Sequence, residues 1–234
     1  MRKIGLIGGL SWVSTAEYYR RLNQITQDRL GGVSSARLVL ESVDRQAYVE
    51  AVIEREDERA ACEQILNAAQ SVERAGASFA VISCNDVHRF VPEIEPNIGI
   101  PFLHIADAAA RAIKSAGVSN VALLGVRKTM EGDFYPEILA KHGIETTVPN
   151  EAERTFIHDT IYAELVKYVF SEETRRGYVE VIAELASRGA EGVVLGCTEI
   201  PLLLRPEDIA VPSFSTTELH CEAAVEMAIS ASDS

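Results

Sequence analysis

Short apolar runs alternate along this chain with longer segments in which apolar residues recur every three or four positions. The short runs are rich in Val, Ile and Leu and predict buried strands. They cover 3–7, 36–43, the residues before Cys84, 102–105, 120–124, 144–148, the residues before Cys197, and 211–214. The longer segments predict helices over 14–29, 57–75, 107–115, 131–142, 157–170, 172–188 and from 217 onwards.

Some of these elements carry end signals. Ser14 or Thr15 is suited to cap the helix over 14–29. Gly76 follows the strongly amphipathic helix over 57–75 and is expected to end it. The polar segment 44–53 has no clear period, so it is expected to be irregular.

Strands that alternate with helices predict an α/β protein with parallel sheets and helices on both faces. Three landmarks then recur in the same order along the chain, at steps of 117, 113 and 111 residues. The pairs are Gly8 with Gly125, Cys84 with Cys197, and Pro101 with Pro212. A nearly constant step predicts a duplicated α/β unit.

The duplication predicts two similar parallel-sheet lobes related by pseudo-twofold symmetry. The first is expected to hold residues 1–103 plus 214–234, and the second residues 104–213. Ligands of such sheets bind at the carboxyl ends of strands. Cys84 and Cys197 both follow predicted strands, so the active site is expected in a cleft between the lobes, with both thiols in it.

Composition narrows the class of protein. The 234 residues carry a formal net charge of −13, which argues against a nucleic-acid partner. No apolar stretch reaches the roughly 20 residues of a membrane span, and the apolar start is too short for a signal peptide, so we expect a cytoplasmic protein. In that compartment the 4 Cys residues are expected to be reduced thiols. Without CxxC spacing, a GxGxxG fingerprint or a pyridoxal-phosphate lysine context, we expect neither metal nor cofactor.

Two matched thiols suit one kind of chemistry. Inverting a carbon centre requires one group that removes a proton and another that returns one to the opposite face. Cysteine can fill both roles because its reference pKa of about 8.5 lies near working pH. We therefore predict Cys84 and Cys197 as catalytic, and Cys62 and Cys221, in Ala-rich helical surroundings, as core residues.

At several points the chain resembles the aspartate/glutamate racemase family, whose members work with two cysteines and no cofactor. Residues 4–12 and 14–19 are similar to the family's opening. Residues 196–201, Gly-Cys-Thr-Glu-Ile-Pro, resemble its second cysteine motif, and residues 125–131 resemble its middle motif. Residues 84–88 read Cys-Asn-Asp-Val-His, with Asp86 where the family usually has Thr.

The resemblance implies an amino-acid racemase acting on aspartate or glutamate, and a homodimer. It also implies substrate-binding residues. Those are Asn85 and Thr198 for the α-carboxylate and Lys167 for the side-chain carboxylate. From their positions after predicted strand ends, we expect Thr129 as a third donor to the α-carboxylate and Arg45 as the alternative to Lys167. Ser11 and Thr15, after Gly9, are expected to line the same cleft.

Asp86 and Glu199 each follow a thiol by two residues. Either carboxylate could bind a substrate ammonium or tune its thiol. Asp86 is expected to raise the pKa of Cys84, unless it pairs with the substrate amine, His88 or Arg89. Its presence leaves other reactions of the superfamily open, among them those of maleate isomerases and of hydantoin or broad-specificity racemases. Thiol redox chemistry and a non-catalytic binding role are weaker alternatives.

Overall fold

The computed structural model describes residues 1–230, which form two compact units. Unit 1 contains Met1–His104 and the C-terminal helix from His220 onwards, and unit 2 contains Ile105–Leu219. The last four residues, 231–234, which the sequence assigns to the first lobe, lie outside the described residues. Each unit is an α/β layer structure built on its own parallel sheet, so the predicted fold class is confirmed.

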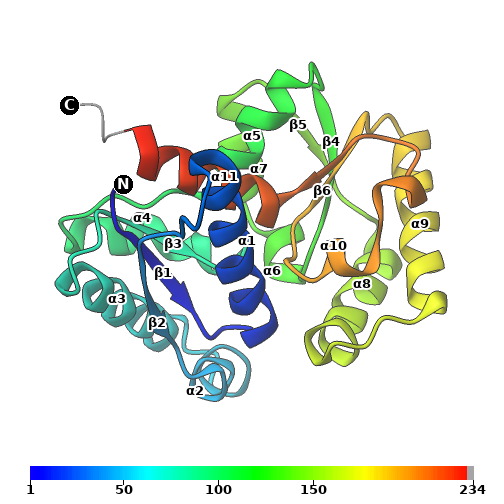
Figure 1. Ribbon diagram of the computed structural model, residues 1–234. Coiled ribbons are helices and arrows are strands. Elements are labelled where there is room, and N and C mark those ends of the chain that lie inside the picture. Colours follow the sequence, from blue (N-terminus) through cyan, green and yellow to red (C-terminus); the bar gives the residue numbers. More distant parts are fainter. Residues whose placement is uncertain (231–234) are drawn as a thin grey trace. The chain divides into compact units, whose positions relative to one another are not determined.

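Unit 1 is built on the parallel strands β1 (Ile4–Gly8), β2 (Leu38–Ser42) and β3 (Phe79–Ile82), in the order β2-β1-β3 (Figure 1). Beside β3, Phe102 forms a single bridge to Ala80 instead of the strand predicted over 102–105. A full strand does not form over 102–105 because the next helix already begins at Ile105.

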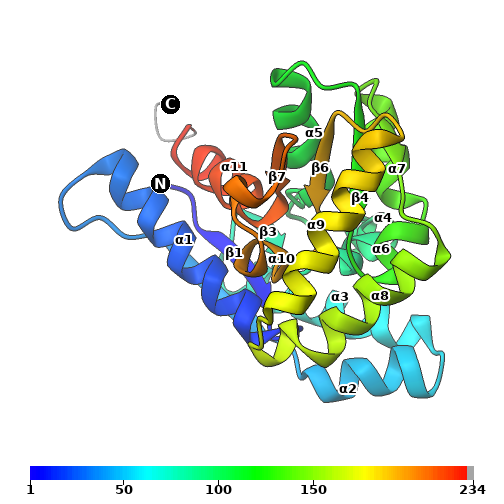
Figure 2. The ribbon, with the colours of Figure 1, turned by 90° about the vertical axis from the view of Figure 1, so that its right-hand side faces the viewer.

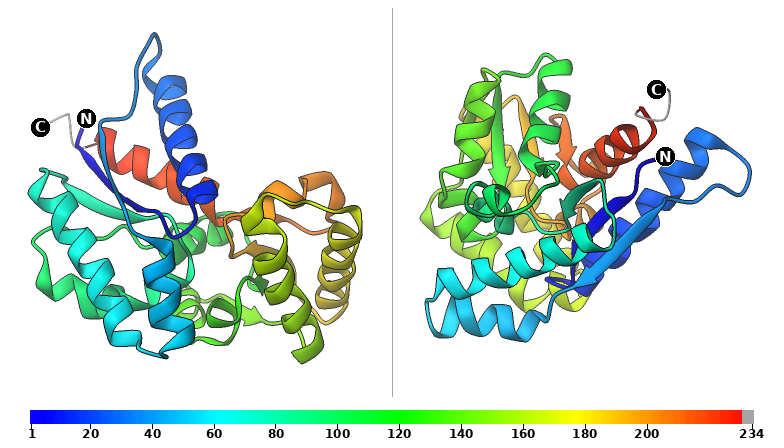
Figure 3. Two further views of the ribbon diagram at one scale, coloured as in Figure 1. Left: turned by 90° about the horizontal axis from the view of Figure 1, so that it is seen from below. Right: turned by 90° about the vertical axis from the view of Figure 1, so that its left-hand side faces the viewer.

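Helices cover both faces of this sheet. On one face α1 (Trp12–Leu30) and the part of α11 (Thr216–Ser230) in unit 1 share a core with Ile4, Leu6 and Val81. Both views of Figure 3 show these two helices, α1 in blue and α11 in red, close to each other. On the other face α3 (Glu58–Arg74) packs its predicted apolar stripe against Ile7 and Ile82. Burial on both faces explains why these strands are continuously apolar.

Unit 2 repeats this plan with four parallel strands in the order β5-β4-β6-β7. The strands are β4 (Asn120–Leu124), β5 (Glu145–Thr147), β6 (Gly192–Leu195) and β7 (Ser213–Ser215). One face is covered by α5 (Ile105–Ser115) and α7 (Phe134–Lys141). The other is covered by α8 (Glu151–Ala163) and α9 (Glu172–Ser187), which face the viewer in Figure 2.

The predicted duplication is present in the backbone hydrogen bonds. Three contacts of unit 1 recur at matching positions of unit 2, with N···O distances of 2.7–2.9 Å. They are Ala80 N to Pro101 O and Val193 N to Pro212 O, Ser83 N to Ile7 O and Gly196 N to Leu124 O, and Ser78 N to Lys3 O with Glu191 N to Asn120 O. The same frame therefore carries each cysteine to the carboxyl end of a parallel strand, β3 in unit 1 and β6 in unit 2.

Several local predictions were wrong. Segment 44–53 is helical, with α2 (Arg45–Val49) capped by the Asp44 side chain and followed by a π-helix (Glu50–Glu54). The tertiary burial of Tyr48 and Ala51 stabilises it, and the local sequence does not encode that burial.

Other boundaries shifted for local reasons. The helix predicted over 131–142 begins later, as α7 at Phe134, and an extended Gly132 separates it from α6 (Arg127–Glu131), a helix that was not predicted. Helix α8 begins at Glu151, earlier than predicted, because Asn150 and Glu153 form a capping box. Helix α1 is capped by Ser11, whose Oγ accepts from Ser14 N, rather than by Ser14 or Thr15.

Short helices complete the chain. Around the first cysteine they are η2 (Asp86–Phe90), α4 (Val91–Ile94) and η3 (Glu95–Asn97). In unit 2 they are η4 (Leu165–Lys167), α10 (Ile200–Leu203) and η5 (Pro206–Asp208). Among residues 1–230, no helix combines the length and the apolar character needed to cross a membrane.

Candidate active site

Cys84 lies just past the end of β3, where η2 begins. Its thiol is half-buried and donates a hydrogen bond to Oδ1 of Asp86 at 3.0 Å. The strand order places this point at the switch between β1 and β3, where open parallel sheets bind ligands. The structure therefore brings together Cys84 and Asp86, two residues that the sequence predicted for the site.

Asp86 is also ion-paired. Its Oδ2 lies 2.8 Å from Nη1 of Arg89, and the same nitrogen donates to the Asp86 carbonyl at 2.8 Å. The Arg89 side chain, only 15% exposed, also donates to Glu58 Oε2 at 2.8 Å and to the Tyr48 hydroxyl at 3.3 Å. Of the partners the sequence left open for Asp86, the structure brings Arg89 to it.

The charges of this cluster stabilise one another. Burial alone works against the Arg89 charge, but the charges of Asp86 and Glu58, with the hydrogen bond to Glu58, outweigh it and raise the pKa of Arg89. Burial, and then the Asp86 charge, raises the pKa of Tyr48. The cluster therefore contains a protonated Arg89 and a neutral Tyr48 at neutral pH. Neither Tyr48 nor Glu58 was predicted, because no local pattern connects α2 and α3 to the cysteine motif.

His88 contacts the same loop through the backbone of Cys84. Its Nδ1 lies 2.8 Å from the Cys84 carbonyl, which can only accept, so the proton is on Nδ1. The ring is fully buried beside the rings of His104 and His220, and burial lowers its pKa well below the usual value. The histidine that the resemblance pointed to is thus a neutral buried residue in unit 1, in contact with the backbone of Cys84.

His220 is fixed in a second neutral form. Its Nε2 lies 2.8 Å from the Leu103 carbonyl, and its Nδ1 lies 2.9 Å from the Tyr18 hydroxyl. The Nε2 proton must therefore face Leu103, and Tyr18 donates to Nδ1. Burial lowers the pKa of His220 to about 3.

The start of α1 reaches the same sheet edge. Ser11 and Thr15 are buried, but Thr15 Oγ1 accepts from Gly9 N at 2.9 Å and lies 2.8 Å from the Ser11 carbonyl. Ser14 Oγ donates to the Ser83 carbonyl at 2.6 Å. These hydroxyls join α1 to the end of β3, which gives Thr15 a structural role. Asn85, buried next to Cys84, is the other predicted residue at this edge.

Cys197 occupies the matching place in unit 2, past the end of β6. Its thiol is half-buried and donates to Oε2 of Glu199 at 3.1 Å. The neighbouring Thr198 hydroxyl donates to the same oxygen at 2.7 Å. Glu199 and Thr198 are both buried, so the carboxylate lies between the thiol and a hydroxyl.

Thr129 lies close to this second site. It is fully buried on α6, and its Oγ1 has no hydrogen-bond partner within residues 1–230. A Cβ added at Gly125 or Gly196 would lie 3.0–3.2 Å from the Thr129 side chain and closer still to backbone oxygens. The glycines that end the two central strands therefore allow a threonine to pack on the backbone that leads into Cys197.

Comparison with known proteins agrees with this arrangement. The chain matches the Asp/Glu/hydantoin racemase family over residues 7–224. The chain belongs to this family. Among solved structures it is similar to a candidate Asp/Glu racemase from Yersinia pestis, with 43% identity, a TM-score of 0.90, and 98% of this chain and 100% of that chain covered.

Two further relatives extend the comparison. An aspartate racemase homologue from Pyrococcus horikoshii is 32% identical, with a TM-score of 0.84 over 97% of this chain and 99% of that chain. The broad specificity amino-acid racemase RacX of Bacillus subtilis is 21% identical over 204 residues, covering 86% of this chain and 87% of RacX.

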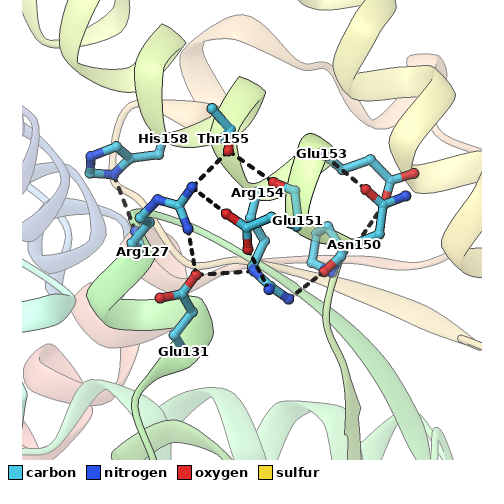
Figure 4. Close-up of polar contacts among 9 residues, drawn as sticks. Arg127, Glu131, Asn150, Glu151, Glu153, Arg154, Thr155 and His158 are labelled. Carbon is cyan, nitrogen blue, oxygen red and sulfur yellow. Dashed lines mark hydrogen bonds and ion pairs between the residues drawn. The ribbon is translucent and has the colours of Figure 1, made fainter.

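In this racemase-family protein, a charge network holds the helix that carries Thr129. Figure 4 shows Arg127 and Arg154 alternating with Glu131 and Glu151, at 2.7–3.1 Å. The Arg127 amide also donates to His158 Nδ1 at 3.2 Å. Burial lowers the pKa of His158, which favours the neutral ring that this bond requires. The pairs tie α6 to α8 and were not predicted from the sequence.

The two predicted cations differ in their surroundings. Arg45 is half-buried at the start of α2 and donates to the Leu10 carbonyl at 2.8 Å. In the described part of the chain it forms no ion pair, which leaves its charge available to a ligand. Lys167 is exposed at the end of η4 in unit 2.

The remaining cysteines lie away from the sheet edges. Cys62 and Cys221 are buried in helices, and burial followed by Glu93 raises the pKa of the Cys62 thiol to about 11. Within residues 1–230, no group of three or more His, Cys, Asp or Glu side chains could hold a metal ion.

Proposed function

We propose that this protein is a cofactor-independent amino-acid racemase in which Cys84 and Cys197 transfer the two protons. One cysteine, as thiolate, removes the α-proton, and the other, as thiol, returns a proton to the opposite face; the roles exchange for the other enantiomer. The observation that carries the proposal is the matched pair of thiol–carboxylate contacts, 3.0 Å at Cys84 and 3.1 Å at Cys197. They lie at corresponding strand ends of two similar units in a member of the racemase family.

The proposed contacts to the substrate α-carboxylate are Asn85, Thr198 and Thr129. Thr129 has the strongest support, because a fully buried hydroxyl with no partner in the described chain has a hydrogen bond to offer a ligand. Ser11 and Thr15 are proposed to shape the site. Thr15 does so through its bonds to the backbone, since its hydroxyl is already used there.

For the substrate we propose aspartate or glutamate. Arg45, a cation without an ion pair in residues 1–230, would hold the side-chain carboxylate, and Lys167 is the second candidate. The Picrophilus torridus and Pyrococcus horikoshii relatives, named as an aspartate racemase and a homologue of one, favour aspartate. RacX, a broad specificity amino-acid racemase, favours a wider range as the second candidate. A cytoplasmic homodimer without metal or cofactor remains a prediction.

The test is exchange of the α-proton in deuterated water, followed by NMR, with L- and D-forms of aspartate, glutamate, alanine and lysine. We expect exchange with inversion for aspartate or glutamate, without added cofactor. Cys84→Ser and Cys197→Ser should each abolish inversion, whereas Cys62→Ala should not. Inversion retained in both active-site variants would refute the two-thiol mechanism.

Arg45→Gln and Lys167→Gln then test the substrate assignment. If Arg45 holds the side-chain carboxylate, Arg45→Gln should raise KM for aspartate and glutamate by about tenfold or more, the cost of a lost charge-assisted hydrogen bond. Exchange of alanine or lysine, where present, should change little. Equal losses for all substrates would show that Arg45 is structural.

A further inference from the structure

Arg89 is the feature that most clearly separates the two thiol sites. Both thiols donate to a carboxylate two residues on, at 3.0 and 3.1 Å. At Cys197 that carboxylate, Glu199, accepts from the Thr198 hydroxyl. At Cys84 the carboxylate, Asp86, instead meets a buried guanidinium.

We propose that Arg89 is a positioning residue for Cys84: it holds the Asp86 carboxylate against the thiol and supplies the positive charge that offsets that carboxylate when the thiol ionises. The proposal rests on the racemase function in one respect, the need for Cys84 to be able to exist both as thiol and as thiolate. The geometry that carries it is independent of the substrate.

The positioning follows from how Arg89 is fixed. Nη1 binds both the carboxylate and the carbonyl of Asp86, each at 2.8 Å. Nε and Nη2 bind Glu58 Oε2 on α3 at 3.1 and 2.8 Å. The guanidinium also lies 4.2 Å from the centroid of the Phe90 ring. A planar fork with partners on two sides cannot rotate without breaking several bonds, so Asp86 is held in one rotamer.

The electrostatic role follows from the signs of the charges. An ionised Asp86 next to Cys84 favours the thiol, because a thiolate beside it would place two negative charges about 3 Å apart. Arg89 opposes this, since its positive charge lies 2.8 Å from the other oxygen of the carboxylate. Among residues 1–230, Tyr48, Glu58 and His88 also contact the cluster, and the Arg89 charge reaches the Cys62 thiol as well.

The arrangement also assigns Asp86 a role other than substrate binding. One of its oxygens accepts from the Cys84 thiol and the other from Arg89. Both oxygens of Asp86 thus have a partner within the protein. Because one of those partners is the thiol itself, the role we assign to Asp86 is control of Cys84.

The test measures each thiol directly. The equilibrium constant between enantiomers is unity, so kcat/KM stays equal in the two directions in every variant and cannot report on one cysteine. Iodoacetamide reacts with the thiolate, and mass spectrometry of the peptides that contain Cys84 and Cys197 gives separate rates across pH. The midpoint of each profile then reports how readily that cysteine ionises.

We expect opposite shifts. Arg89→Gln should move the Cys84 midpoint up by about one pH unit, and Asp86→Asn should move it down by about the same amount. In the double variant the midpoint should return towards that of the wild type. Arg89→Lys, which keeps the charge but not the fork, should shift the midpoint less than Arg89→Gln. The Cys197 midpoint should stay constant throughout.

Controls separate folding and function from the inference. Thermal unfolding checks each variant; should Arg89→Gln fail to fold, Asp86→Asn and Arg89→Lys still test the opposite signs. Arg175→Gln removes a surface arginine of unit 2 and should leave both profiles unchanged. Shifts of equal sign, no shift at Cys84, or equal shifts at Cys197 would overturn the proposal. If the wild type inverts no amino acid but the opposite shifts occur, the racemase proposal fails and this inference stands.

Discussion

The buried histidines of unit 1 predict a loss of stability in mild acid, and His220 allows its size to be worked out. The ring is fully buried, Nε2 donates to the Leu103 carbonyl, and Nδ1 accepts from Tyr18. Both bonds require the neutral ring. Burial accordingly lowers its pKa from 6.5 to about 3.

The sign of the effect follows from proton linkage. Above pH 6.5 His220 is neutral in the folded and unfolded states, and its contribution does not change. As pH falls below that value, the unfolded chain takes up a proton that the folded protein does not. The free energy of unfolding then falls by about 1.4 kcal/mol per pH unit. The loss from His220 reaches ~2 kcal/mol at pH 5 and ~4 kcal/mol at pH 3.

The perturbation is His220→Gln, which can keep a donor and an acceptor but does not titrate. Urea unfolding followed by circular dichroism at pH 7.5 and pH 5 gives the loss of stability for each protein. We expect the loss to be smaller in His220→Gln by ~2 kcal/mol. Tyr18→Phe is the matched control: it removes the bond to Nδ1 but not the titration, so it should keep the wild-type loss. An unchanged loss in His220→Gln would refute the reasoning.

Three further substitutions test other parts of the structure. Thr129→Val removes a buried hydroxyl with no partner in the described chain, so thermal unfolding should show equal or higher stability while KM rises. Gly9→Ala should lower the free energy of unfolding by ~2 kcal/mol or more in urea titrations, because φ is +87° and the new Cβ would lie 2.1 Å from the Val43 carbonyl oxygen. Asn150→Ala removes the capping box of α8 and should cost ~1 kcal/mol, measured in the same way.

The positions of most strands and helices along the chain could be predicted because their signals are local. Residues 120–124 form β4 as predicted, since an apolar run buried on both faces needs no knowledge of its partners. The stripe along α3 is buried for the same reason. Segment 44–53 was missed because its helical form depends on Tyr48 and Ala51 reaching a core assembled from distant residues.

In the candidate site too, contacts between residues close in sequence could be predicted, whereas contacts that depend on tertiary packing could not. A thiol and a carboxylate two residues apart after a strand are close whatever else the chain does, and both pairs are in contact. Arg89 was named as a possible partner of Asp86 because it follows on the same turn. Glu58 and Tyr48 reach Arg89 only through the packing of α2 and α3, which leaves no trace in the cysteine motif.

The duplication explains what the two sites share, and it also shows where they diverged. Matching backbone bonds, from Ser83 to Ile7 and from Gly196 to Leu124, deliver each cysteine to the end of its strand. A backbone frame of this kind fixes the thiol and the residue two positions on, but not the partner of that residue. The partner is therefore free to change, and it did so, to a guanidinium in one unit and a threonine hydroxyl in the other. In the proposed mechanism the two cysteines exchange roles but need not have equal proton affinities, and the partner of each carboxylate is where that difference would be set.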